Sequence, residues 1–265
     1  MQLEPTGERM IPEHYRSTAE SYVIHLMHLA TYRFAMQFTA GRRVLDYGCG
    51  AGYGSASIAE VAAMVDAVDV AEDAIAYANA RHARDNLRFR TIDPATALPY
   101  PDASFDVVLS FQVFEHVVDT TRYLSEIRRV LVPGGTLLLV TPDRSTRLLP
   151  MQRPWNRWHV REYDADSLAR ELSAHFARVD MYGMTGRDDV IAVELRRCNR
   201  MRWLSLPFTL PIWPDRFRIA LLNLVHRARG TAAPPGPPRE FDYDVDAIRI
   251  ERGARPSVNL VAVTR

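Results

Sequence analysis

The sequence predicts an α/β fold built on a doubly wound, mostly parallel, seven-stranded sheet with helices on both faces. The first observation is that short apolar runs alternate with amphipathic segments of helical period, which is the pattern of strands joined by helical crossovers. The second is a glycine-rich turn between the first apolar run and the next helix. The third is the closing segment SVNLVAVTR, whose apolar and β-branched residues predict a strand. Ligands of such sheets bind at the carboxyl ends of the strands.

The individual elements follow in order along the chain. A polar segment up to Ser17 precedes a predicted helix at 19–37. The strands are expected at 43–47, 64–70, 87–91, 105–111, 135–141, 178–183 and in the closing segment. Further helices are expected at 55–63, 71–83, 120–131 and near 166–174. The stretch DDVIAVELRR, residues 188–197, fits either a helix or a strand.

These elements suggest four regions. Residues 1–40 form an N-terminal helical cap, and residues 41–195 form the ligand-binding core. Residues 196–238 combine an Arg-rich apolar helical insertion with the Pro-rich linker TAAPPGPP. Residues 239–265 return to the core as C-terminal strands that complete its sheet.

The composition of the chain limits the partners and the location that we expect for it. The 265 residues are 47% hydrophobic and 25% charged, with a formal net charge of +1, so we expect no nucleic-acid partner. No apolar run is long enough to cross a bilayer, and the first residues lack the apolar core of a signal peptide, so we expect a cytoplasmic protein. Cys49 and Cys198 are expected to be free thiols.

The absence of lysine excludes two classes of enzyme. All 33 residues counted as Lys or Arg are arginine. The chain therefore has no amine for a Schiff base with pyridoxal phosphate and no ammonium group for a Walker P-loop.

The glycine-rich turn VLDYGCGAGYGS does not fit the dinucleotide fingerprint. The pattern G-x-G-x-x-G needs a glycine at its sixth position, where this chain has Tyr53, counting from Gly48. The turn instead follows D-x-G-x-G-x-G, with Asp46 two residues before the first glycine. A carboxylate there repels a pyrophosphate and favours a cationic ligand, such as an ammonium or sulfonium group.

Two more acids lie at the ends of the next two predicted strands. Asp69 ends the second strand, where a carboxylate can accept hydrogen bonds from both hydroxyls of a ribose. Asp93 follows the third strand, where a carboxylate can bind the exocyclic amine of an adenine. A nucleoside with a positively charged tail satisfies Asp46, Asp69 and Asp93 together.

The residues from 41 to 142 resemble the class I S-adenosylmethionine (SAM) dependent methyltransferases, which have a Rossmann-like fold. The resemblance lies in VLDYGCGAGYGS, VDAVDVAEDAIAYA, TIDPATALPYPDASFDVVLSFQVFEHV and LSEIRRVLVPGGTLLLVTPD, in family order. It implies SAM as cofactor, with the methionine end near Asp46 and the glycines, the ribose at Asp69, adenine at Asp93, and the backbone of Phe111 along the cofactor. The cofactor-binding residues so implied are Asp46, Gly48, Cys49, Gly50, Gly52, Asp69, Val70, Asp93 and Phe111.

The segments TGERMIPEHY and WHVREYDADSLARELSAHF resemble the members of this family that act on sugars and cell-surface glycans. The sequence thus predicts an O-methyltransferase of a sugar or glycan, which could be linked to a lipid. Two alternatives are O- or C-methylation of a small aromatic or quinone-like metabolite and a SAM-binding module without catalysis. A nicotinamide-dependent dehydrogenase is a more distant alternative.

A neutral sugar hydroxyl is a poor nucleophile, so a general base near the strand ends helps the reaction. His116 and His159 are the candidates, although either can instead be structural. Trp155 and Trp158 flank His159 and suit the C–H face of a sugar. Three nearby arginines can bind an acidic group of the acceptor: Arg153, Arg157 and Arg161. No metal is expected.

Residues 201–230 form the basic and apolar part of the insertion. Eight arginines lie between residues 196 and 229, against Asp215 as the single acid. A helix is expected from Asp215, with Phe217, Leu221, Leu224 and Val225 on one face. Such a segment can bind an anionic membrane at its inner face. The alternative is that this face packs on its own domain or forms a homodimer.

Overall fold

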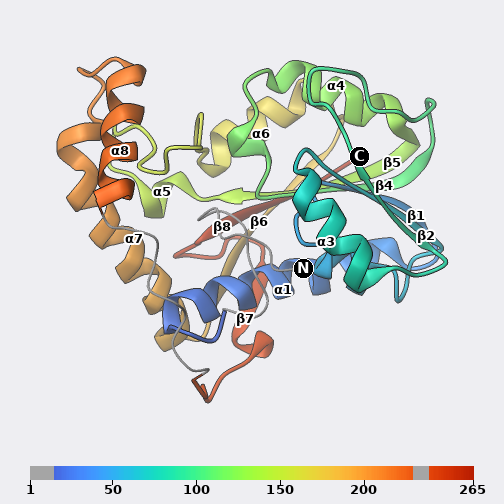
Figure 1. Cartoon of the computed structure of the whole chain (residues 1–265), viewed down its shortest axis with the longest axis horizontal. Helices are drawn as coiled ribbons and strands as arrows, with labels where there is room; N and C mark the ends of the chain where they lie inside the picture. Colours follow the sequence, from blue (N-terminus) through green and yellow to red (C-terminus); the bar gives the residue numbers. More distant parts are fainter. Residues whose placement is uncertain (1–14, 229–238) are drawn as a thin grey trace.

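The centre of the molecule is a mixed sheet of eight strands, ordered β3-β2-β1-β4-β5-β8-β6-β7, in a computed structural model that describes residues 15–228 and 239–265 (Figure 1). Neighbouring strands from β3 to β5 are parallel, whereas β8 is antiparallel to both β5 and β6, and β7 is antiparallel to β6. The strands are β1 Arg43–Tyr47, β2 Met64–Asp69, β3 Leu87–Thr91, β4 Phe105–Phe111, β5 Leu131–Pro142, β6 Val179–Gly186, β7 Ile248–Glu251 and β8 Asn259–Thr264.

The predicted fold class is confirmed, but the predicted number of seven strands is wrong. The additional strand is β7, which has the sequence IRIE and pairs with β6 at the edge of the sheet. Four residues, of which two are charged, give too short a pattern for its pairing to be predicted from the sequence.

Helices cover both faces of the sheet (Figure 1). Side chains of α1, α2 and α3 enter one buried apolar cluster with the strands, and those of α4 and α6 enter another. The helices are α1 Ala19–Thr39, α2 Tyr53–Ile58, α3 Glu72–His82, α4 Thr120–Val130, α5 Arg144–Arg147, α6 Ala165–Ser173, α7 Asp188–Thr209 and α8 Asp215–Ala228. Thr18 caps α1 in a capping box with Ser21.

The stretch DDVIAVELRR forms the first turns of α7. This helix continues without a break through residues 195 and 196, where the sequence suggested a boundary between core and insertion. Helix α8 begins at Asp215 as predicted. None of the helices in the described ranges is both long and apolar enough to cross a membrane.

The sheet topology determines where a ligand can bind. Strand β1 lies between β2 and β4, so the connection from β1 to β2 runs to one side and the chain returns to the other side at β4. Loops after β1 and β4 therefore leave the sheet in opposite directions and open a crevice between them. The glycine turn follows β1, and the 3-10 helix η2, Phe114–His116, follows β4.

Candidate active site

A cavity of about 860 Å³ lies at the carboxyl ends of the central strands. Its walls come from the glycine turn, the end of β2, the loop after β3, the segment after β4, helices α1 and α4, and Trp158. The lining includes six of the residues that the sequence assigned to cofactor binding: Gly48, Cys49, Gly50, Asp69, Val70 and Phe111. Asp46, Gly52 and Asp93 are not among the lining residues.

The backbone of the glycine turn faces the cavity at Gly50. This residue has a φ of +53°, and a Cβ built on it meets nothing within 4 Å, so a ligand can lie directly against the main chain. Gly52 has a different role. Its Cβ would lie 2.7 Å from both Ala78 and the ring of Phe89, so this glycine permits the close packing of the turn on α3 and β3.

Asp69 connects the turn to the end of β2. One carboxylate oxygen accepts the backbone N–H of Gly50 at 2.8 Å, and the other accepts that of Ala71 at 2.9 Å. A carboxylate has about four acceptor positions, so these two bonds leave capacity for the hydroxyls of a ribose in the cavity.

Asp46 lies beneath the turn and is fully buried. Its Oδ2 accepts hydrogen bonds from Ser55 at 2.7 Å and from Tyr32 at 3.3 Å, while Oδ1 has no hydrogen-bond partner in the described part of the chain. Burial raises the pKa of Asp46 to about 6, although both hydroxyls act against this shift. The carboxylate therefore lies behind the turn and does not line the cavity.

Asp93 is exposed, and its side chain accepts the N–H of Ala95 at 2.8 Å. Its neighbours Ile92, Pro94 and Ala95 line the cavity. The loop after β3 thus forms part of the wall, but the carboxylate is engaged in shaping the loop itself.

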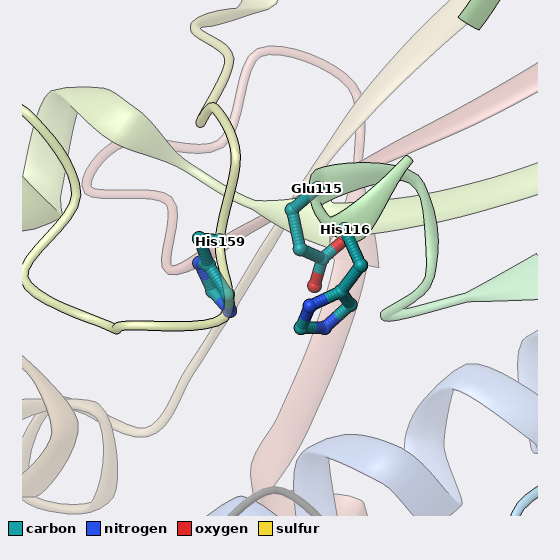
Figure 2. Close-up of side chains that lie close together, drawn as sticks. All are labelled: Glu115, His116 and His159. Atoms are coloured by element: carbon teal, nitrogen blue, oxygen red, sulfur yellow. The ribbon is translucent and has the colours of Figure 1, made fainter. Parts of the chain in front are cut away.

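The two predicted histidines lie beside each other with Glu115 (Figure 2). Figure 2 shows Glu115 and His116 on one segment, facing His159 from another. The two imidazole rings meet edge to face, with centroids 4.9 Å apart. Only His116 lines the cavity. Its Nδ1 lies 3.1 Å from the carbonyl oxygen of Trp158, and because a carbonyl only accepts, Nδ1 is the donor; in a neutral ring Nε2 then carries the lone pair.

His159 is buried one layer behind the cavity wall. Its Nδ1 is 2.8 Å from Glu162, which in turn binds Arg147 at 3.0 Å. Burial alone would raise the pKa of Glu162, but Arg147 and His159 together lower it to about 2. These buried contacts hold the loop between α5 and α6 in place. They also orient the imidazole ring of His159, which packs on His116.

Glu115 completes the group and could, with both histidines, hold a metal ion. It is buried, accepts the hydroxyl of Thr141 at 3.0 Å, and has a pKa raised by burial. One ligand atom from each of Glu115, His116 and His159 lies within 4.8 Å of the others. Two imidazoles and a carboxylate suit a transition metal, so the expectation that no metal is needed stays a prediction.

The structure places the three predicted acceptor-binding arginines elsewhere. Arg153 pairs with Asp215 at 2.9 Å, Arg157 donates to Asn223 at 3.0 Å, and Arg161 donates to the carbonyl of Val118. None of the three lines the cavity.

Several aromatic lining residues were not identified from the sequence. They come from helix α1, from the first turn of α2, from the end of β1 and from α4, and they are His28, Tyr32, Tyr47, Tyr53 and Tyr123. The hydroxyl of Tyr53 lies 3.1 Å from Nδ1 of His28. A helix pattern shows which face is apolar, but it does not show which end of that face borders a cavity, so the sequence carries no signal for this wall.

The fold and the site together define an α/β enzyme core with a nucleoside-sized cavity at its topological switch point. Residues 45–139 match the family described as a methyltransferase domain. A probable SAM-dependent methyltransferase of Mycolicibacterium smegmatis is 41% identical over 183 residues, which cover 69% of this chain and 68% of that protein. A probable SAM-dependent methyltransferase of Mycobacterium tuberculosis is equally similar, and the chain covers 64% of its length.

More distant relatives carry other names. A ubiquinone biosynthesis O-methyltransferase of a Caulobacter species is 36% identical over 43% of this chain and 46% of its own length. A solved SAM-dependent methyltransferase from Thermotoga maritima aligns with a TM-score of 0.57 and 14% identity, covering 92% of this chain and 91% of that one, and shows the fold. The chain belongs to the SAM-dependent methyltransferases and is an enzyme that uses SAM.

The residues of the cavity fit this cofactor. The open space above Gly50 admits a ligand against the backbone, and Asp69 presents a carboxylate to the cavity. A volume of about 860 Å³ lies within the usual range for cofactor and substrate sites, and is large enough for an acceptor beside the nucleoside.

Proposed function

We propose that the chain methylates a hydroxyl oxygen of a sugar or glycan acceptor, with His116 as the general base. The observation that carries this proposal is the position of His116 on the cavity wall, with its Nδ1–H bound to the carbonyl of Trp158. That bond fixes the tautomer in which Nε2 is basic. It also fixes the ring relative to the exposed indole of Trp158, which lines the same wall.

When bound, SAM supplies an electrophilic methyl group on a sulfonium. The chain has to hold the acceptor oxygen in line with that group and exclude water, and alignment of this kind can lower a barrier by roughly 7 to 11 kcal/mol. We assign cofactor binding to the glycine turn, Asp69, Val70 and the segment at Phe111, with Asp46 acting from beneath. His116 accepts the proton of the attacking hydroxyl, a role that accelerates such steps by about 10² to 10⁴.

The indole of Trp158 supports a sugar acceptor. Its side chain is 51% exposed and lies within reach of a ligand next to His116. A pyranose packs its C–H face on such a ring while its hydroxyls find polar partners. We further propose that the enzyme binds this acceptor in the cytoplasm and that nucleic acid is not a partner.

A quinone-like aromatic acceptor is the second candidate. The cavity wall contains Tyr32, Tyr47, Tyr53, Phe111 and Tyr123, and some relatives are named ubiquinone biosynthesis O-methyltransferases. A flat apolar ring can pack between these side chains. Both candidates use the same base and the same cofactor, so they differ only in the acceptor.

The test is transfer of a radiolabelled methyl group from SAM to extracts separated into glycans, lipids and small aromatic metabolites. Label in the glycan fraction supports the sugar proposal, and label in a quinone or catechol fraction supports the second candidate. A chain that binds SAM but releases no S-adenosylhomocysteine with any fraction would be a binding module.

Once an acceptor has been identified, His116→Asn should lower turnover by about 100-fold or more, because the proposed base would no longer accept the proton of the attacking hydroxyl. His159→Asn should lower it by less than about tenfold, since this ring only positions His116. The matched control is His175→Asn, because His175 does not line the cavity. SAM affinity and thermal unfolding of each variant separate a loss of the base from a loss of the site. Wild-type turnover in His116→Asn would contradict the assignment.

Dialysis of the enzyme against EDTA should leave methyl transfer unchanged, because the proposed mechanism uses an imidazole and no metal. The readout is initial rate before and after dialysis, with Mg²⁺, Mn²⁺ or Zn²⁺ added back. A lost rate that one of these ions restores would make Glu115, His116 and His159 a metal site instead of a base and its supports.

A further inference from the structure

Helix α8 is oriented with its polar side against the protein. The guanidinium of Arg218 is buried and donates to the carbonyl of Pro154 at 2.7 Å, and Asn223 accepts from Arg157. Asp215 pairs with both Arg153 and Arg218. These polar contacts attach α8 to the loop at 153–157, while Leu221 and Leu222 of the same helix are half-buried. A surface helix usually directs its polar side to solvent instead.

The apolar side of the α7–α8 pair consequently faces outward. Six large apolar side chains of this pair and its connection are between 42% and 74% exposed. We call them the apolar tip: Trp203, Leu204, Ile212, Trp213, Phe217 and Leu224. Helix α8 and the last turns of α7 lie at the edge of the molecule, whereas the first turns of α7 pack on the sheet (Figure 1). Exposed apolar residues concentrated in this way mark an interaction surface.

The charges around the apolar tip are positive. Arg216 is exposed next to Phe217, and Arg196 is exposed on α7, whereas Arg200 on α7 is paired with Glu20 at 3.0 Å. Asp215, the single acid between residues 196 and 229, is already paired with two arginines. Arg216 and Arg196 have no acidic partner among the described residues. The tip therefore carries unbalanced positive charge beside its apolar side chains.

We propose that the apolar tip binds the surface of an anionic lipid bilayer. Tryptophans suit the boundary between headgroups and acyl chains, because the ring is apolar and its N–H is polar. Arginines near the surface are attracted to anionic headgroups. A second copy of the chain is a poorer occupant, because a two-fold contact would bring the same arginines together. The described helices do not cross the membrane, so this contact is peripheral.

The contact would also place the cavity near lipid. The loop that holds α8 through Arg153 and Arg157 continues to Trp158, which lines the cavity. The binding itself is independent of methyl transfer and is measured on the full chain alone.

The test is cosedimentation of the chain with vesicles of phosphatidylcholine mixed with phosphatidylglycerol, and with vesicles of phosphatidylcholine alone. We expect pelleting with the anionic vesicles at low salt, less pelleting at high salt, and little with neutral vesicles. Phe217→Ser/Leu224→Ser should lower the partition coefficient by about tenfold or more, and Arg216→Gln by a smaller factor.

The control is Val61→Ser, which also removes an exposed apolar side chain but follows α2 and does not line the cavity. Its partition coefficient should equal that of the wild type. The proposal is overturned if the wild type does not pellet with anionic vesicles, or if Phe217→Ser/Leu224→Ser binds them as well as Val61→Ser does. It is also overturned if sedimentation velocity shows a dimer that Phe217→Ser/Leu224→Ser abolishes, because a second copy would then cover the tip.

Discussion

Among single residues, Asp69 makes the most direct contribution to the proposed cofactor site. Asp69→Ala should weaken SAM binding by about 10- to 100-fold, because it removes a charged acceptor for the ribose. Titration calorimetry measures the change. Glu72→Ala is the control, since Glu72 is an acid in the first turn of the neighbouring helix α3 and does not line the cavity.

The same carboxylate also accepts two backbone N–H groups, so its removal can disturb the turn. Asp69→Asn keeps one accepting oxygen and should bind SAM more tightly than Asp69→Ala. Unchanged affinity in Asp69→Ala would contradict the ribose assignment.

His28 should make the stability of the protein sensitive to acid. Burial lowers its pKa to about 4, compared with 6.5 in the unfolded chain. The folded state therefore favours the neutral ring, and this contribution is complete above pH 6.5 and is lost as the pH falls towards 4. Relative to His28→Gln, the wild-type free energy of unfolding should fall by up to about 3 kcal/mol over this range. Urea unfolding at a series of pH values measures it, and parallel pH curves for the two proteins would contradict it.

The sequence predicted the positions of some site residues correctly and could not predict those of others. Gly50 and Asp69 follow strand ends, so the fold class alone places them on the cavity. The sequence could not rank His116 above His159, because the difference depends on the carbonyl of Trp158 and on burial behind Glu162. Nor could it show that Asp93 is engaged by its own loop.

At the level of elements, α8 shows what periodicity can and cannot predict. The start at Asp215 and an apolar face containing Phe217 and Leu224 follow from helical spacing. Which face lies against the protein depends on partners far away in the sequence, such as the carbonyl of Pro154 for Arg218. Spacing within one helix contains no information about those partners.

The buried ion pair between Arg147 and Glu162 should be essential to the stability of the loop that carries His159. Both side chains are less than 10% exposed. Arg147→Met should lower the free energy of unfolding by about 3 to 5 kcal/mol, because it leaves the charge of Glu162 buried without its guanidinium. Thermal and denaturant unfolding measure this loss.

The double variant Arg147→Met/Glu162→Gln serves as the control for this ion pair. It removes the isolated charge and should recover part of the lost stability. The pKa of Glu162 is lowered to about 2, so the contribution of the pair is present above pH 4.5 and is lost as the pH falls towards 2. A double variant no more stable than Arg147→Met would mean that packing, not charge, explains the loss.

For the whole molecule, the order of the strands explains why the site is where it is. The turn after β1, the end of β2 and the segment after β4 meet because β1 lies between β2 and β4. Alternation of strands and helices was enough to predict the fold class and a ligand at the carboxyl ends of the strands, but the strand order itself was not predicted. Strands were expected in residues 239–265, but β7 was not predicted individually, because its pairing depends on β6, more than sixty residues earlier in the chain.

The cavity exists only when these distant segments are assembled, so SAM should stabilise the entire fold. At a free concentration of 100 times its Kd, a ligand specific for the folded state raises the free energy of unfolding by about 2.7 kcal/mol. For a chain of this size the expected rise in Tm is roughly 5 to 10 °C.

Scanning calorimetry with SAM, with S-adenosylhomocysteine and with NADP⁺ measures this rise in Tm. The first two should stabilise the wild type, whereas NADP⁺ should not, because the turn lacks the third glycine of the dinucleotide fingerprint and has Asp46 beneath it. Asp69→Ala should need a SAM concentration about 10 to 100 times higher for the same rise. Equal stabilisation by NADP⁺ would show that the turn binds a pyrophosphate and would contradict the proposed arrangement of the cofactor site.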